Sequence, residues 1–372
     1  MLIRICYRQN INYLAPIKNP SLLILFMLTI DGSAGEGGGQ IIRTSLALAA
    51  LTGREIRIND IRAKRPKPGL RPQHLTAVKT LAKVCNAKLK GAFVGSKELI
   101  FKPGKIEDAS LVANIGTAGS ISLLLQQVLP VSLACNLKLR VFGGTDVSFA
   151  PPINYIQKVT FHYLKKMQAE LALNIIARGY YPKGQGCVTF ESKKCLPLKP
   201  IRFTSLGSLQ KIECYAHCSG MPAKVAKDSA IVAKNTLKEL LGSFEWVEHI
   251  EASPERKQTI GFGVDLFAKY SNCVLGANSL GLAGSKPENI GEKAAKALFE
   301  EISFLAPLDS HCIDQLIPFM ALASGKSIIE GKLTKHAITN IMVTEKLLGV
   351  EFKVENKEQR ARISVEGTAF TI

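Results

Sequence analysis

One order of segments occurs three times along this chain, and it limits the architecture more than any other property of the sequence. In residues 35–102 a glycine-rich loop leads into a predicted helix, an alternating strand, a second helix and two closing strands. Residues 116–192 and 314–366 follow the same order with little identity of letters. Three helix–strand–helix–strand–strand units predict pseudo-three-fold packing of sheets with helices inside, an α/β (α+β) fold.

Residues 201–302 interrupt this order. They predict a strand, a long helix, three further strands and a last helix of their own. We therefore expect a smaller α/β domain inserted between the second and third repeats. The main domain would then comprise residues 27–200 and 303–372.

The first 26 residues contain three positive charges, a short apolar stretch and no acidic residue. They have no small-residue cleavage site, and Met27 begins a domain-like start, MLTIDGS. This pattern favours an upstream extension or a misassigned start codon over a targeting segment.

The chain is strongly basic, and this points to a polyanionic partner. Its 372 residues include 48 Lys and Arg but 30 Asp and Glu, a formal charge of +18. A hydrophobic content of 47% excludes a disordered protein, and the longest early apolar run, 22–28, is too short to span a membrane. We expect RNA, DNA or nucleotide phosphates as ligands, with no membrane and no obligatory protein partner.

Nine cysteines, an odd count, occur mostly in apolar surroundings, as reduced core thiols do. Cys214, His217 and Cys218 could suggest zinc, but the alternation in KIECYAHC predicts a strand and no second ligand pair follows. A reducing cytoplasm is therefore the expected location.

The common ATP motifs are absent. GKS at 325–327 has Met320 where a P-loop needs glycine, and Asp31-Gly32 lacks the preceding lysine of nucleotidyl transferases. Instead, the glycine run 35–40 enters a helix, where bare amides bind anions. A rigid basic loop, 61–74, follows it and strengthens the prediction of a phosphate site.

Histidine can attack phosphorus, and two of the six histidines begin helices of the third repeat. His336 follows Thr334-Lys335 at the second helix, and His311 precedes Asp314-Gln315 at the first. A helix N-terminus stabilises phosphate charge, so His336 is the candidate nucleophile.

From about Met27 to the C-terminus the chain resembles the RNA 3′-terminal phosphate cyclase family. The resemblance is carried by eight ordered motifs: IDGSAGEGGGQIIR, IRAKRPKPGLRPQHL, GTAGSISLLLQ, GGTDVSFAPP, ARGYYPKGQG, LGANSLG, HCIDQLIPFMALA and KHAITNI. It implies three repeats similar to the C-terminal domain of translation initiation factor three, plus the inserted domain.

The resemblance also implies an activity: ATP-dependent conversion of an RNA 3′-phosphate to a 2′,3′-cyclic phosphodiester, through histidine-AMP and RNA-adenylate intermediates. His336 would be the covalent histidine, and Glu36 would contact Mg²⁺ or Mn²⁺. The adenylate pocket would comprise Gln126, Pro151, His311, Cys312, Ile313, Asp314 and Gln315. Substrate phosphate would be bound by Arg43, Arg62, Arg65, Arg71 and His74.

Two positions depart from the family pattern. His311 stands where tyrosine is common, and Lys64 where a small residue is usual. The alternatives are a non-catalytic RNA-binding paralogue acting in ribosome assembly, and an enolpyruvyl transferase of related repeat architecture. Non-catalytic paralogues lack the histidine and the glycine loop, both of which are present here. An enolpyruvyl transferase does not fit the ordered motifs.

Overall fold

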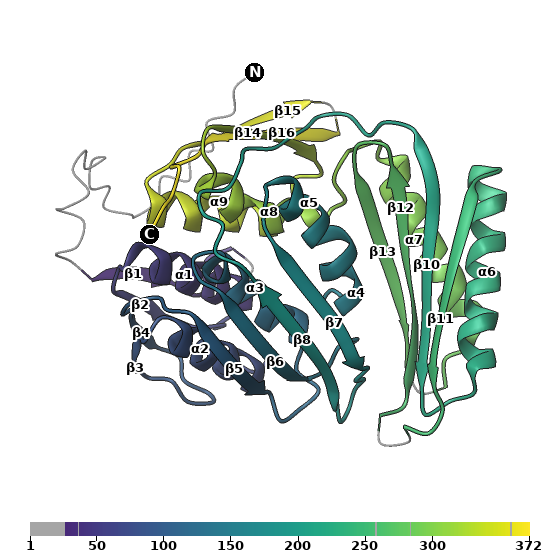
Figure 1. Cartoon of the computed structure of the whole chain (residues 1–372), viewed down its shortest axis with the longest axis horizontal. Coiled ribbons are helices and arrows are strands. Elements are labelled where there is room, and N and C mark those ends of the chain that lie inside the picture. Colours follow the sequence, from purple (N-terminus) through teal and green to yellow (C-terminus); the bar gives the residue numbers. More distant parts are fainter. Residues whose placement is uncertain (1–26, 36, 257–258, 283, 358) are drawn as a thin grey trace.

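The structure, a computed structural model, describes residues 27–35, 37–256, 259–282, 284–357 and 359–372. Three four-stranded sheets lie around a central group of helices, and a fourth sheet with two long helices lies to one side (Figure 1). The predicted α+β class and the three-fold repeat are confirmed. The expected N-terminal extension, 1–26, lies outside the described residues.

The first repeat forms a sheet in the order β1-β2-β4-β3, with β1 parallel to β2. Its strand β2 alternates as predicted, because Ile56 and Ile58 are buried while Arg57 and Asn59 are partly exposed. The elements are β1 (Leu28–Asp31), α1 (Gly39–Thr52), β2 (Ile56–Asn59), α2 (Pro72–Val84), β3 (Lys88–Lys90) and β4 (Leu99–Lys102).

The second repeat has the same strand arrangement, β5-β6-β8-β7. The single helix expected over 151–167 is divided by a π-helical turn, η2, a widening that recurs at functional sites. The elements are β5 (Ala109–Asn114), α3 (Ile121–Ser132), β6 (Leu137–Gly143), α4 (Ile153–Tyr155), η2 (Ile156–Thr160), α5 (Phe161–Lys166), β7 (Leu171–Ala177) and β8 (Gly186–Ser192).

The third repeat follows the same plan, β9-β14-β16-β15, although its first strand has only two residues. Because β9 pairs in parallel with β14, residues at the expected start of the inserted segment belong to the third sheet. The elements are β9 (Arg202–Phe203), α8 (Cys312–Leu322), β14 (Lys326–Gly331), α9 (Lys335–Leu348), β15 (Phe352–Lys357) and β16 (Arg360–Glu366).

The inserted unit lies between β9 and α8, within the third repeat. Its sheet, β11-β10-β12-β13, carries α6 and α7 on one face, and β13 contacts η2 of the second repeat. Nearly all of β12 is buried, as expected for a strand covered on both faces. The elements are β10 (Leu209–Ser219), α6 (Ala223–Leu241), β11 (Glu245–Ser253), β12 (Gly261–Tyr270), β13 (Val274–Gly281) and α7 (Pro287–Ser303).

The three repeats close into a ring through their helices. The first helix of each repeat packs on the second helix of the repeat before it: α3 contacts α2, α8 contacts η2, and α1 contacts α9. This closure brings the glycine-rich start of α1 beside the start of α9, almost 300 residues later in the chain. Within the described ranges, no helix is both long and apolar enough to cross a bilayer.

Candidate active site

The first turns of α1, α8 and α9 meet at the side chain of Gln40. Its Nε2 donates to Asp314 Oδ2 at 3.0 Å and to the main-chain carbonyl of His336, also at 3.0 Å. Gln40 is the second residue of α1, Asp314 the third of α8 and His336 the second of α9. Three helix N-termini therefore converge at one point.

A second layer of hydrogen bonds fixes these helices one turn deeper. Thr44 Oγ1 donates to Asn340 Oδ1 at 2.7 Å, and Asn340 Nδ2 donates to the main-chain carbonyl of Asp314 at 2.7 Å. Thr44 and Asn340 are buried, so their polar atoms need these partners. The contacts set the relative positions of the three helix starts.

The convergence favours anions. The positive end of a helix dipole attracts negative charge, and the first N–H groups of a helix have no partner within it. On α9, Thr334 caps the helix by accepting from the Ala337 N–H at 3.0 Å, whereas Gly38 gives α1 no side-chain cap. His336 is exposed at this point and is therefore accessible to a phosphate ligand.

The glycine loop before α1 passes too close to its neighbours for side chains. Gly35 has φ +56°, and a Cβ there would lie 2.4 Å from Thr339 Oγ1 on α9. A Cβ on Gly39 would lie 2.5 Å from His74 Nε2 and 3.1 Å from Arg43 Nη1. The loop thus runs between the α9 helix that bears His336 and the basic segment of the first repeat.

The basic loop lies against this glycine loop. Lys64 Nζ donates to the Gly35 carbonyl at 3.4 Å, and a Cβ on Gly38 would lie 3.2 Å from Arg65 Nη2. Arg62 has a different role, because its Nη1 donates to the carbonyls of Lys67 at 2.7 Å and Gly69 at 2.9 Å. Arg62 therefore braces the loop that carries the other cations.

Burial sets the charge states of the groups beside Gly39. It lowers the pKa of Arg43 to about 10, which still leaves the guanidinium protonated at neutral pH. Burial, reinforced by neighbouring arginines, lowers the pKa of His74 to about 3, so its imidazole is neutral. His74 Nδ1 accepts the Arg71 N–H at 3.1 Å, which leaves Nε2 to carry the ring proton and act as a donor.

Asp314 is the acidic group at the convergence point. Burial raises its pKa to about 7, opposed by the nearby positive charge of Arg43. Its carboxyl group therefore changes charge near neutral pH, next to the carbonyl of the residue proposed as nucleophile.

A small cavity of about 40 Å³ lies among α1, α3, η2, α8 and α9. It joins four residues that the sequence analysis singled out: Arg43, Gln126, Asp314 and Gln315. Gln315 is held by Thr160 of η2, whose Oγ1 donates to Gln315 Oε1 at 2.7 Å. Pockets that hold a whole ligand measure roughly 300–1,000 Å³. This cavity is much smaller, so it is a recess beside the site and has room for only a few atoms of a ligand.

The remaining residues expected for the adenylate pocket do not line this cavity. The side chains of Cys312 and Ile313 are fully buried in the core, and Pro151 lies half-buried before α4, outside the lining of the cavity. His311 is exposed at the N-cap of α8. Glu36, the expected metal contact, lies outside the described residues.

Sequence reasoning missed the residues that join the helices and the carboxylate that caps α8. Gln40 and Thr44 follow the glycine run, but no periodicity distinguishes them from other polar residues. Asp309 accepts N–H groups from His311 at 3.0 Å, Cys312 at 2.8 Å and Gly276 at 2.9 Å. A short Asp-Ser sequence before a helix start was the available signal for this cap.

Comparison with known proteins agrees with the resemblance seen in the sequence. The profile of the family described as RNA 3′-terminal phosphate cyclase matches residues 34–354. A Caldivirga maquilingensis protein named RNA 3′-terminal phosphate cyclase is 42% identical, covering 91% of this chain and 98% of its own length. Proteins of the same name from Pyrococcus furiosus and Nitrosospira multiformis are each 40% identical, covering 88% and 91% of this chain and 95% and 96% of their own.

We predict that Gly35→Ala destabilises the protein more than Gly53→Ala does. Both glycines have positive φ, +56° and +68°, but nothing lies within 4 Å of a Cβ placed on Gly53. Gly53→Ala should cost the backbone term of about 1 kcal/mol, and Gly35→Ala a further 1–3 kcal/mol, roughly, for overlap with Thr339. Urea denaturation measures both, and equal losses would refute the close approach.

The raised pKa of Asp314 predicts a pH-dependent stability. Between its ordinary pKa of 3.8 and the folded value of about 7, the native state holds a proton that the unfolded chain has lost. The free energy of unfolding should therefore fall as pH rises across this window and level off above it. The difference between wild type and Asp314→Asn, measured by urea denaturation at pH 5 and pH 8, isolates this effect at roughly 1–4 kcal/mol. A difference that does not change with pH would contradict it.

Proposed function

This chain belongs to the RNA 3′-terminal phosphate cyclase family, and on that premise we propose that it is an ATP-dependent enzyme forming 2′,3′-cyclic phosphodiester ends on RNA. Its substrates would be ATP and an RNA ending in a 3′-phosphate, and its products AMP, pyrophosphate and the cyclised RNA. The convergence of three helix N-termini at Gln40, beside His336, carries the proposal. It offers a phosphate-binding position next to a nucleophile.

In the first step, an imidazole nitrogen of His336 attacks the α-phosphorus of ATP. An N–P bond forms, and the bond to the bridging oxygen breaks as pyrophosphate leaves. Negative charge develops on the phosphorus oxygens near the N-termini of α1 and α9. The dipoles of these helices are already oriented toward that position, so they stabilise the charge without rearrangement. The exposed position of His336 gives the nucleotide access to its imidazole.

The second step passes AMP to the RNA. An oxygen of the terminal 3′-phosphate attacks the phosphorus of the adenylate, the N–P bond breaks and His336 is restored. The resulting mixed anhydride has a good leaving group, which the original phosphate monoester lacks. The adjacent 2′-oxygen then attacks the 3′-phosphorus, loses its proton and expels AMP, and its attachment to the same ribose makes ring closure fast.

The basic groups of the first repeat would hold the phosphates. Arg43 is protonated beside the glycine loop, and Arg65 and Arg71 offer guanidinium groups that match phosphate oxygens. His74 would donate from Nε2 as a neutral group, and Arg62 would act by shaping the loop.

A divalent metal, Mg²⁺ or Mn²⁺, would supply Lewis-acid stabilisation of crowded phosphate charge. We expect Glu36 to contribute to its binding. Gln40 Oε1, in the first turn of α1, is buried and receives no hydrogen bond from the described part of the chain, so it is an oxygen that would be free to bind the cation.

We assign catalysis to the three repeats, and the positioning of α8 to the inserted unit.

The free thiols of the eight described cysteines fit a reducing compartment, and we propose the cytoplasm.

The nucleophile is tested by labelling with ATP that carries radioactive α-phosphate. The wild type should form a protein–AMP adduct that is labile in acid and stable in alkali, as a phosphoramidate is. His336→Ala should abolish the label, because no other group would attack phosphorus. His249→Ala, which removes an exposed histidine of the inserted unit, is the matched control and should label normally. Labelling of a folded His336→Ala protein would place the nucleophile elsewhere, and failure of the wild type to label would favour the RNA-binding paralogue.

Three RNA ends separate activation from ring closure. A strand with a 3′-phosphate should be cyclised with release of AMP, and a strand ending in a 2′-deoxy, 3′-phosphate nucleotide should stop as an adenylylated end. A 3′-hydroxyl strand should not react, because it presents no phosphate acceptor. Gel and mass analysis with ATP and magnesium distinguishes these products. Cyclisation without ATP, or adenylylation of the hydroxyl end, would contradict the mechanism.

A further inference from the structure

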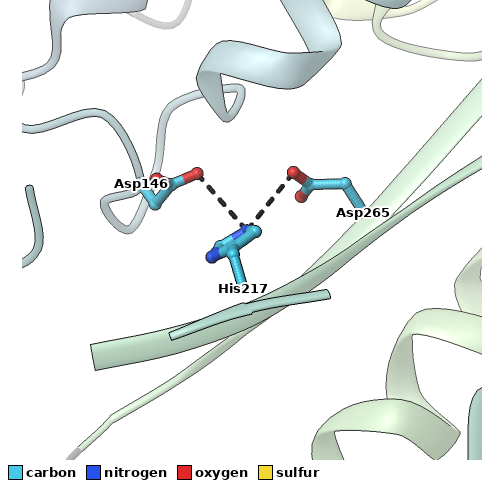
Figure 2. A group of neighbouring side chains, drawn as sticks. All are labelled: Asp146, His217 and Asp265. Carbon is cyan, nitrogen blue, oxygen red and sulfur yellow. Dashed lines mark ion pairs between the residues drawn. The ribbon is translucent and has the colours of Figure 1, made fainter. Parts of the chain in front are cut away.

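A buried group of side chains joins the second repeat to the inserted unit, away from the helix starts around Gln40. Asp146 lies in the connection after β6, while His217 and Asp265 lie on the paired strands β10 and β12 (Figure 2). In the pairing register Tyr215 is opposite Asp265 and His217 is opposite Gly263, so His217 and Asp265 share one face of the sheet. All three side chains are at most 3% exposed.

The ring of His217 is oriented with one nitrogen left over. Nδ1 is 2.7 Å from the Tyr180 hydroxyl, which fixes the plane of the imidazole. Nε2 is buried and has no hydrogen-bond partner in the described structure. It points between two carboxylates, at 3.6 Å from Asp146 Oδ1 and 3.4 Å from Asp265 Oδ2 (Figure 2).

These distances are too long for charged hydrogen bonds, which measure about 2.7–2.9 Å. They suit an ion held between the groups, because zinc lies about 2.0–2.2 Å from histidine nitrogen and carboxylate oxygen. The three donor atoms lie within 4.8 Å of one another, and a small cavity of about 10 Å³ opens beside them. Ligating histidines also usually bond a second group through the other ring nitrogen, as His217 does with Tyr180.

The charge balance points the same way. Arg178 is buried and pairs with Asp146 at 3.1 Å and with Glu251 at 2.8 Å. Asp265 receives a hydrogen bond from Asn154 Nδ2 at 2.9 Å, which adds no charge. Glu251 is 49% exposed, so water screens its charge, and the buried carboxylates of Asp146 and Asp265 share the single buried guanidinium of Arg178. A bound cation would offset the remaining buried negative charge.

We propose that Asp146, His217 and Asp265 bind a divalent transition-metal ion, with Zn²⁺ the best match for one imidazole and two carboxylates. The cavity leaves space for a water molecule as a further ligand. The ion would join the second repeat to the inserted sheet and would be separate from the metal expected at Glu36. Cys214 and Cys218 take no part in this site. Both are an odd number of residues from His217 in strand β10, so their side chains lie on the opposite face of the sheet. The Cys218 thiol donates to the Met221 carbonyl instead.

The test uses the full chain, stripped with a chelator and then given Zn²⁺ or Co²⁺ alone. Plasma mass spectrometry after gel filtration should find one tightly held Zn²⁺ per chain, and Zn²⁺ should raise the melting temperature. Co²⁺ should give visible absorption bands without the sulfur charge-transfer bands of thiolate ligands. X-ray absorption of the zinc form should show only nitrogen and oxygen neighbours.

Two near-isosteric variants, Asp265→Asn and His217→Asn, should weaken Zn²⁺ binding at least tenfold and lose the rise in melting temperature. His249→Asn, on the neighbouring strand β11 and exposed, is the matched control and should bind like wild type. Glu36→Gln should also keep this site, which separates it from the catalytic metal.

Absence of stoichiometric Zn²⁺ in the wild type would overturn the proposal and leave an imidazolium ion pair or a water in its place. Sulfur neighbours in the absorption spectrum, or full binding by folded Asp265→Asn and His217→Asn chains, would overturn it equally. None of these results depends on whether the protein cyclises RNA.

Discussion

The close passage of the glycine loop between two other segments is the constraint on which the site depends. A methyl group at Gly35 would overlap Thr339, and one at Gly39 would overlap His74. Because neither side chain exists, the start of α1 can reach both the basic loop of the first repeat and the start of α9 in the third. Gln40 can then donate to Asp314 and to the His336 carbonyl, and the three helix N-termini share one electrostatic field.

The ring of repeats explains why this site draws on distant parts of the chain. Each sheet has the same strand order, and each first helix packs on the second helix of the preceding repeat. Side-chain hydrogen bonds cross two of these contacts: Thr44–Asn340 joins α1 to α9, and Thr160–Gln315 joins η2 to α8. A pseudo-symmetric scaffold therefore provides the packing, and a few polar residues at its junctions position the helix starts of the site.

Periodicity in the sequence predicted nearly all helices and strands, since each buries one face in a regular pattern. It missed β1, β5 and β9, the leading strands of the three repeats, because β1 and β9 have only four and two residues and partly exposed β5 alternates weakly. Four of the residues singled out from the motifs, Arg43, Gln126, Asp314 and Gln315, line one cavity. Motif order could not distinguish Asp314, which faces the cavity, from Cys312 and Ile313, which face the core. Nor could it distinguish Arg62, which stabilises the basic loop, from the basic residues beside it. Both differences depend on the direction of the side chain.

The inserted unit bears on the site even though no predicted catalytic group lies within it. The chain returns from α7 directly into α8, and Asp309 at this junction accepts the Gly276 N–H of β13 together with the first N–H groups of α8. Tyr155, from the second repeat, donates its hydroxyl to the same carboxylate. One buried side chain thus couples the inserted sheet, the segment before η2 and the helix that carries Asp314. Because unpaired N–H groups in the core are costly, a shift of the inserted unit would be transmitted to the start of α8. The insertion is therefore placed where its packing controls the geometry of the third repeat.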